Sequence, residues 1–166
     1  MSDNDVPRDA VVIERCFDAP IDLIWQMWTD PQHFMAWYGP DGATIPDARM
    51  DVRVGGTRLV CMEVDTPEGP RRMWFSGEYL EVVENERLVY TESMSDEKGN
   101  VSSPSAMGMP EGHPMTTEVS VQLEDLGGRT KMVMSHAGIP PESPGATGWT
   151  MAFEKLIAHV QAHTER

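Results

Sequence analysis

The C-terminal segment constrains the fold of this chain more than any other part of the sequence. Trp149, Phe153, Leu156, Ile157 and Val160 recur at i, i+4, i+7, i+8 and i+11, which places them on one face of an α-helix. Such a helix can begin at Pro144. About twenty residues at 1.5 Å each span roughly 30 Å, enough to cross a β-sheet. We therefore expect a long helix whose apolar face covers a sheet.

The region between residues 43 and 137 predicts that sheet. Six segments have strand-like composition: residues 43–52, 57–64, 71–83, 86–93, 116–123 and 129–136. The Gly55-Gly56 pair suits a tight turn because glycine accepts a positive φ at little cost. These connections are too short for parallel crossovers, so the sequence predicts an antiparallel sheet.

The N-terminal part adds a seventh strand over residues 10–17 and then two short helices, around residues 21–28 and 34–38. The fold class is therefore α+β: a curved antiparallel sheet of about seven strands around the long C-terminal helix. Residues 10–166 form one domain, and residues 1–9 a flexible tail. Residues 94–115, rich in Gly, Ser, Pro and Met, predict a mobile loop, either a functional lid or plain disorder.

Charge narrows the choice of partners. The chain of 166 residues carries 27 acidic side chains against 13 lysines and arginines, a formal charge of −14. Nucleic acids and anionic membranes attract positive surfaces, so we expect neither as a partner. No apolar stretch approaches the ~18 residues of a membrane span. Cys16 and Cys61 lie in strand-like segments, and we interpret both as buried thiols in a reducing cytoplasm.

Aromatic and methionine side chains on the middle strands and the last helix are the candidates for a ligand site. They would line a cavity between the sheet and the C-terminal helix, where methionine adds an adaptable surface. Trp74 and Phe75 are neighbours on one strand, so at most one of them faces inward. The predicted ligand-binding residues are Met62, Met73, Trp74, Tyr79, Tyr90, Met132, Trp149 and Phe153. A core filled by the same side chains, without a cavity, is the alternative.

The histidines are weaker candidates for a functional site than the aromatic and methionine residues. His113 and His136 lie at strand ends, where either could shuttle a proton near neutral pH. His159 and His163 are spaced i, i+4 and could hold a metal ion from one helix face, but two histidines make an incomplete site. The sequence therefore predicts no catalytic residue, no metal ion and no cofactor.

Two groups of charged residues are best interpreted as solvent-exposed. The acidic side chains of residues 78–97 could include a paired-carboxylate site, but a solvated sheet face is favoured. Arg53 and Arg58 flank the Gly55-Gly56 turn, and an inward arginine could bind a ligand carboxylate. Their place at strand ends favours exposed positions that support solubility.

Short motifs that follow one another along residues 10–164 resemble those of a known family. They include Thr29-Asp30-Pro31, Trp37-Tyr38-Gly39-Pro40, Asp51-Val52-Arg53-Val54-Gly55-Gly56, Glu86-Arg87-Leu88-Val89-Tyr90-Thr91 and Gly148-Trp149. In order and spacing they resemble the activator of heat-shock-protein-90 ATPase homologue-like branch of the START-related (SRPBCC) superfamily. The resemblance implies a helix-grip (START/Bet v-like) fold whose sheet and long helix enclose a pocket for apolar ligands.

The leading hypothesis is a cytoplasmic, non-enzymatic protein that binds an apolar or amphipathic small molecule between sheet and helix. An alternative is a protein-interaction or co-chaperone-like module whose acidic surface contacts a chaperone-like partner. A third hypothesis is an enzyme of cyclase or hydrolase type that uses His113, His136 or a buried carboxylate.

Overall fold

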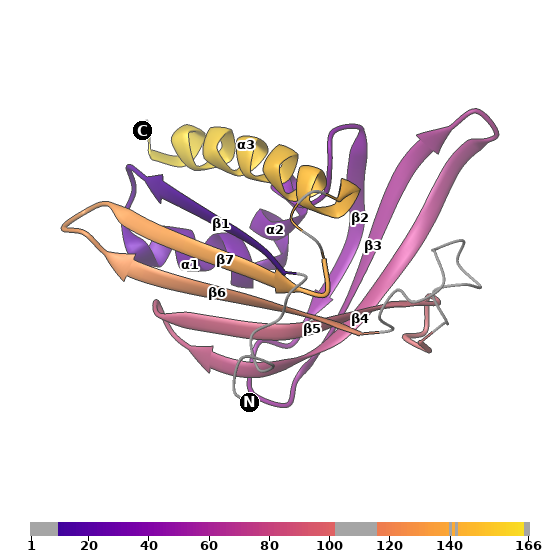
Figure 1. The fold of residues 1–166 in the computed structure, drawn as a ribbon, viewed down its shortest axis with the longest axis horizontal. Helices are drawn as coiled ribbons and strands as arrows, with labels where there is room; N and C mark the ends of the chain where they lie inside the picture. The colour runs from indigo at the N-terminus through magenta and orange to yellow at the C-terminus, as the bar shows by residue number, and fades with distance from the viewer. Residues whose placement is uncertain (1–9, 102–115, 140, 142, 165–166) are drawn as a thin grey trace.

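The computed structural model describes residues 10–101, 116–139, 141 and 143–164 (Figure 1). The tail predicted for residues 1–9 and most of the predicted loop at 94–115 lie outside the described residues. The elements in chain order are β1 (Ala10–Phe17), α1 (Ile21–Thr29), α2 (Pro31–Trp37), β2 (Ala43–Met50), β3 (Thr57–Thr66), β4 (Gly69–Val83), β5 (Arg87–Ser95), β6 (Thr117–Asp125), β7 (Thr130–Ala137) and α3 (Pro144–Thr164). The α+β helix-grip prediction is confirmed.

The seven strands form one antiparallel sheet in the order β1-β7-β6-β5-β4-β3-β2. The sheet is strongly curved, so that β2 and β3 turn away from the direction of β6 and β7 (Figure 1). Register shifts interrupt the pairing of β4 with β5 between Tyr79 and Glu81, and that of β2 with β3 between Thr44 and Asp47. Such irregularities increase the local twist of a sheet and help it to curl.

The helix α3 lies along the sheet and, with α1 and α2, closes the core (Figure 1). Trp149, Phe153, Leu156 and Val160 are buried and Ile157 is partly buried, which confirms the amphipathic stripe read from the sequence. Aromatic rings of α1 and α2 meet this stripe: Trp28, for example, packs edge-on against Phe153 with ring centroids 6.2 Å apart.

Local signals explain where α2 begins. The side chain of Asp30 accepts a hydrogen bond from the backbone N–H of Gln32 at 2.9 Å, and Pro31 is the first helical residue. The helix ends at Trp37, whose indole N–H donates to the carbonyl of Met27 at 3.0 Å. This bond ties α2 to α1 and leaves Tyr38 at the entrance to the following loop.

Two interpretations of single residues were wrong. Cys16 is exposed, because the alternation of β1 puts it on the outer face with Val12 and Glu14; Cys61 is buried, and both thiols are free. Arg58 is only 2 % exposed, because it lies on the inner face of β3 with Val60 and Met62.

Among the described residues, no helix is long and apolar enough to cross a membrane.

Candidate functional site

A cavity of about 220 Å³ lies where the first turns of α3 meet the sheet. Its walls come from α3, from the connection between α2 and β2, and from β3, β5 and β7. The lining residues are Tyr38, Gly39, Pro40, Met62, Glu92, His136, Ile139, Gly145, Gly148, Trp149 and Ala152. Small-molecule sites commonly measure about 300–1,000 Å³, so this cavity suits a compact molecule.

One end of the cavity is polar. The hydroxyl group of Tyr38 donates a hydrogen bond to Oε2 of Glu92 at 2.8 Å. Nη1 of Arg58 lies 3.6 Å from the same oxygen. The side chains of Arg58 and Glu92 are 1 % and 11 % exposed. The guanidinium therefore balances the charge of a carboxylate that is almost removed from solvent.

Aromatic rings enclose Arg58 behind this carboxylate. Its guanidinium carbon lies 3.8 Å from the centre of the Tyr90 ring and 5.3 Å from that of Phe34, within the range of cation–π attraction. Among the described residues, the three guanidinium nitrogens and the hydroxyl groups of Tyr79 and Tyr90 are buried without a hydrogen-bond partner. Buried polar groups are normally hydrogen-bonded. This cluster is an exception, because several of its N–H and O–H donors have no acceptor.

Burial also changes the ionisation of the three tyrosines at this site. Removal from solvent raises the pKa of Tyr38, Tyr79 and Tyr90 above the ordinary value of 10.0. The positive charge of Arg58 opposes this rise but does not cancel it. All three hydroxyl groups therefore keep their protons at neutral pH and can act as hydrogen-bond donors.

A chain of hydrogen bonds fixes another part of the lining. The indole N–H of Trp149 donates to Nδ1 of His136 at 2.8 Å. An indole can only donate, so Nδ1 is the acceptor and the ring proton is on Nε2. Nε2 lies 2.7 Å from Oγ1 of Thr117, which donates to the backbone carbonyl of Glu92 at 3.2 Å. Both ring nitrogens of His136 are thus engaged, which favours a structural role for this residue.

The structure separates the eight predicted ligand-binding residues into four groups. Met62 and Trp149 line the cavity. Tyr79 and Tyr90 lie beside Arg58, behind the polar end of the cavity. Met132 and Phe153 are fully buried in the core.

Met73 and Trp74 are half-buried on β4 and do not line the cavity. Phe75 and Met73 pack against the core, so Trp74 lies on the other face of the strand. His113, the other candidate proton shuttle, lies outside the described residues.

Three residues at the polar end were not predicted as ligand-binding. Tyr38 was interpreted as the end of a short helix and as part of a family motif, Glu92 was expected to face solvent, and Arg58 was expected to support solubility. One signal could have found the last two: Arg58 shares the parity of the apolar residues Val60 and Met62, and Glu92 shares that of Tyr90. A charged residue in the inward phase of a strand indicates a buried polar site.

Comparison with known proteins agrees with this architecture. The family described as Activator of Hsp90 ATPase homolog 1-like protein matches residues 18–161. No curated protein sequence matches the chain.

Solved structures match over nearly the whole chain. A Nitrosomonas europaea protein is 21 % identical with a TM-score of 0.74, covering 96 % of this chain and 98 % of its own. A Chromobacterium violaceum protein is 25 % identical with a TM-score of 0.72, covering 92 % and 97 %. An AHSA1 protein from Silicibacter pomeroyi is 19 % identical with a TM-score of 0.69, covering 93 % and 99 %.

Proposed function

The chain belongs to the Activator of Hsp90 ATPase homolog 1-like family, and we propose that it binds a compact, amphipathic small molecule in the cavity between α3 and the sheet. One observation carries this proposal. The cavity has apolar walls, including Met62, Trp149 and Ala152, and a single buried polar end at Glu92 and Tyr38. This combination is typical of a site that takes up an apolar body and orients it through one polar group.

The polar end indicates which group the ligand presents. Tyr38 already donates its proton to Glu92, so the carboxylate offers its remaining acceptor positions to a donor. Because Arg58 already balances the charge of Glu92, a neutral donor is favoured over a cation. The rings of Tyr38 and Trp149 pack edge to face, with centroids 5.5 Å apart and an interplanar angle of 84°, and give the lining an aromatic surface. A compact apolar molecule that carries a hydroxyl group therefore fits best.

A filled-cavity variant tests the proposal. Gly148 lines the cavity, and a Cβ added there would meet the Cβ of Pro40 at 3.7 Å, an ordinary van der Waals contact. An added Cβ is therefore accommodated, and we expect the rest of the Gly148→Leu side chain to extend into the cavity. Ala158→Leu, on the exposed face of the same helix, is the matched control.

The measurement is NMR chemical-shift mapping with a panel of aromatic alcohols, phenols and short-chain amphiphiles. We expect shifts at Tyr38, Trp149 and Met62 with at least one class. The shifts should disappear in Gly148→Leu, persist in Ala158→Leu and weaken in Glu92→Gln. Absence of binding by every class, or binding that Gly148→Leu leaves unchanged, would contradict the proposal.

The acidic-surface hypothesis predicts something different. A protein partner held by surface charge should dissociate as the salt concentration is raised, and Gly148→Leu should leave its binding unchanged. The same pair of variants therefore distinguishes the two functions.

A further inference from the structure

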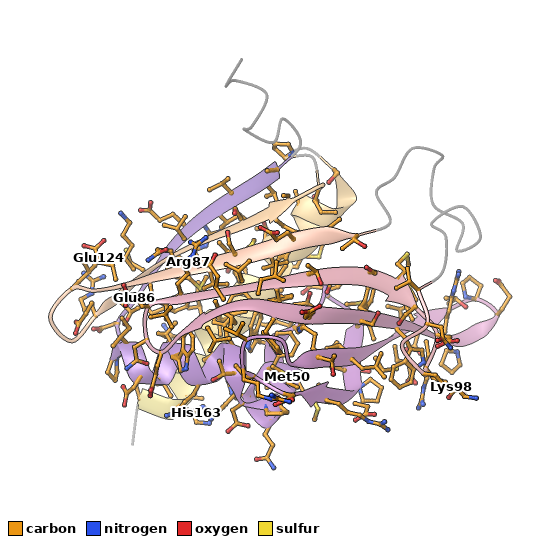
Figure 2. The ribbon with its side chains drawn as sticks, turned by 90° about the horizontal axis from the view of Figure 1, so that it is seen from below. Met50, Glu86, Arg87, Lys98, Glu124 and His163 are labelled. Atoms are coloured by element: carbon orange, nitrogen blue, oxygen red, sulfur yellow. The ribbon has the colours of Figure 1, made fainter. Side chains whose placement is uncertain are left out.

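Three histidines meet where α2 packs against the C-terminal end of α3. His33 comes from the first turn of α2, and His159 and His163 come from successive turns of α3 (His163 is labelled in Figure 2). One ring nitrogen from each lies within 4.8 Å of the others. The i, i+4 pair seen in the sequence thus gains a third imidazole from a residue 126 positions away from His159.

The geometry is close to that of a metal site. Nδ1 of His33 and Nε2 of His159 are 3.0 Å apart. Two nitrogens bound to one tetrahedral zinc ion at 2.0–2.1 Å lie about 3.3 Å apart, so a small adjustment would place an ion between them. The centroid of the His163 ring lies 4.3 Å from that of His159 and 4.9 Å from that of His33. The third ring is therefore adjacent to the position that the ion would occupy.

The hydrogen bond that His163 makes outside the cluster also suits metal binding. Nδ1 of His163 lies 2.8 Å from the backbone carbonyl of His159, and a carbonyl can only accept, so Nδ1 carries the proton. This leaves the lone pair on Nε2 of His163. A histidine that binds a metal ion characteristically donates its other ring N–H to a carbonyl or carboxylate, which orients the ring.

The position of the cluster on α3 favours an added cation. It lies in the last turns of the helix, where the partial negative charge of the helix end attracts cations.

We propose that His33, His159 and His163 form a binding site for a divalent transition-metal ion, with zinc as the reference ion and a fourth position open to water. Three imidazoles with one open position are a known zinc arrangement, and hard cations such as Mg²⁺ prefer oxygen ligands. The ion would link α2 to the end of α3. This site is independent of the cavity, since about twelve residues of helix, roughly 18 Å, separate Trp149 from the middle of the histidine pair.

The test is zinc titration of tag-free protein by isothermal calorimetry, with cobalt absorption spectra to report the coordination geometry. We expect one equivalent of zinc to bind and to raise the unfolding temperature. Each of His33→Gln, His159→Gln and His163→Gln should weaken binding about tenfold or more. A large excess of Mg²⁺ should not compete.

Two controls keep the test decisive. Glu154→Gln removes an exposed negative charge from α3 without touching a histidine, so it should leave the zinc affinity unchanged. Circular dichroism of each histidine variant establishes that the fold is retained, and His163→Gln, in the last turn of α3, changes the least packing. Zinc affinity that is absent in the native chain, unaffected by His33→Gln, or lost in Glu154→Gln would overturn the proposal.

Discussion

Nη1 of Arg58 and Oε2 of Glu92 lie 3.6 Å apart on the inner face of the sheet, although Arg58 is on β3 and Glu92 on β5. The strand between them contributes Gly77, the register partner of Arg58. A Cβ added at Gly77 would lie 3.4 Å from Cγ of Arg58 and would overlap the carbonyl of Thr91. The missing side chain therefore lets the guanidinium reach across β4 to the carboxylate.

We expect Arg58→Met to destabilise the protein by about 3–5 kcal/mol, because it leaves Glu92 buried without a counter-charge. Adding Glu92→Gln should restore much of the loss, since the double variant buries no charge. Urea denaturation of the two single variants and the double variant measures this coupling. Arg53→Met is the control: the Arg53–Asp51 pair is exposed and exposed pairs contribute about 0–1 kcal/mol. Equal effects of Arg58→Met and Arg53→Met would contradict the buried-pair assignment.

The ionisation of tyrosine should report on the same cluster, because Tyr38, Tyr79 and Tyr90 are the three tyrosines of the chain. Burial raises the pKa of each above 10.0 in the folded state. Above pH 10 the unfolded chain then holds fewer protons than the folded chain. Stability should fall with rising pH by up to about 1.4 kcal/mol per unit for each tyrosine.

The measurement is the ultraviolet absorbance of tyrosinate during alkaline titration, with circular dichroism recorded in parallel. Tyrosinate should appear together with unfolding, and the urea-unfolded protein should titrate near 10. A tyrosinate signal near pH 10 in the folded protein would show that a tyrosine of the cluster is accessible.

Two glycine-to-alanine changes should have opposite effects. Gly77→Ala forces a Cβ against the backbone of Thr91, and we expect a loss of about 2–3 kcal/mol. Gly148→Ala fits beside Pro40 within α3 and should stabilise by up to about 1 kcal/mol through helix propensity. Thermal or urea unfolding of both variants checks this, and a neutral Gly77→Ala would disprove the close approach of β4 and β5.

The two cysteines should differ in reactivity. Cys16 is exposed, whereas burial raises the pKa of the Cys61 thiol, only partly offset by Arg72. Since the thiolate is the reactive form, Cys16 should react with a thiol reagent in the native protein and Cys61 only after unfolding. One reactive thiol without urea and two with urea is the expected result. Loss of the native reaction in Cys16→Ser identifies the residue, and its persistence there would contradict the assignment.

The order of strands and helices could be predicted from the sequence because periodicity is a local property. The stripe of α3 and the alternation of the strands depend on neighbours within about a turn or a few residues. The predicted strand at residues 71–83 accordingly differs from β4 by two residues at its start. Antiparallel pairing followed from the short connections, whereas the register shifts that help the sheet to curl are visible only in the structure.

The sites depended on contacts between distant residues, which no local pattern contains. Alternation puts Arg58 and Glu92 on particular faces of their strands, but only the sheet order and the glycine between them bring the two charges together. Likewise, the pairing of His159 with His163 is visible in the helix repeat, whereas His33 joins them only because α2 packs against the end of α3. The sequence by itself determined the elements and their apolar faces. The tertiary structure decided which polar side chains are buried together, because burial and charge pairing depend on the packing of segments far apart in the chain.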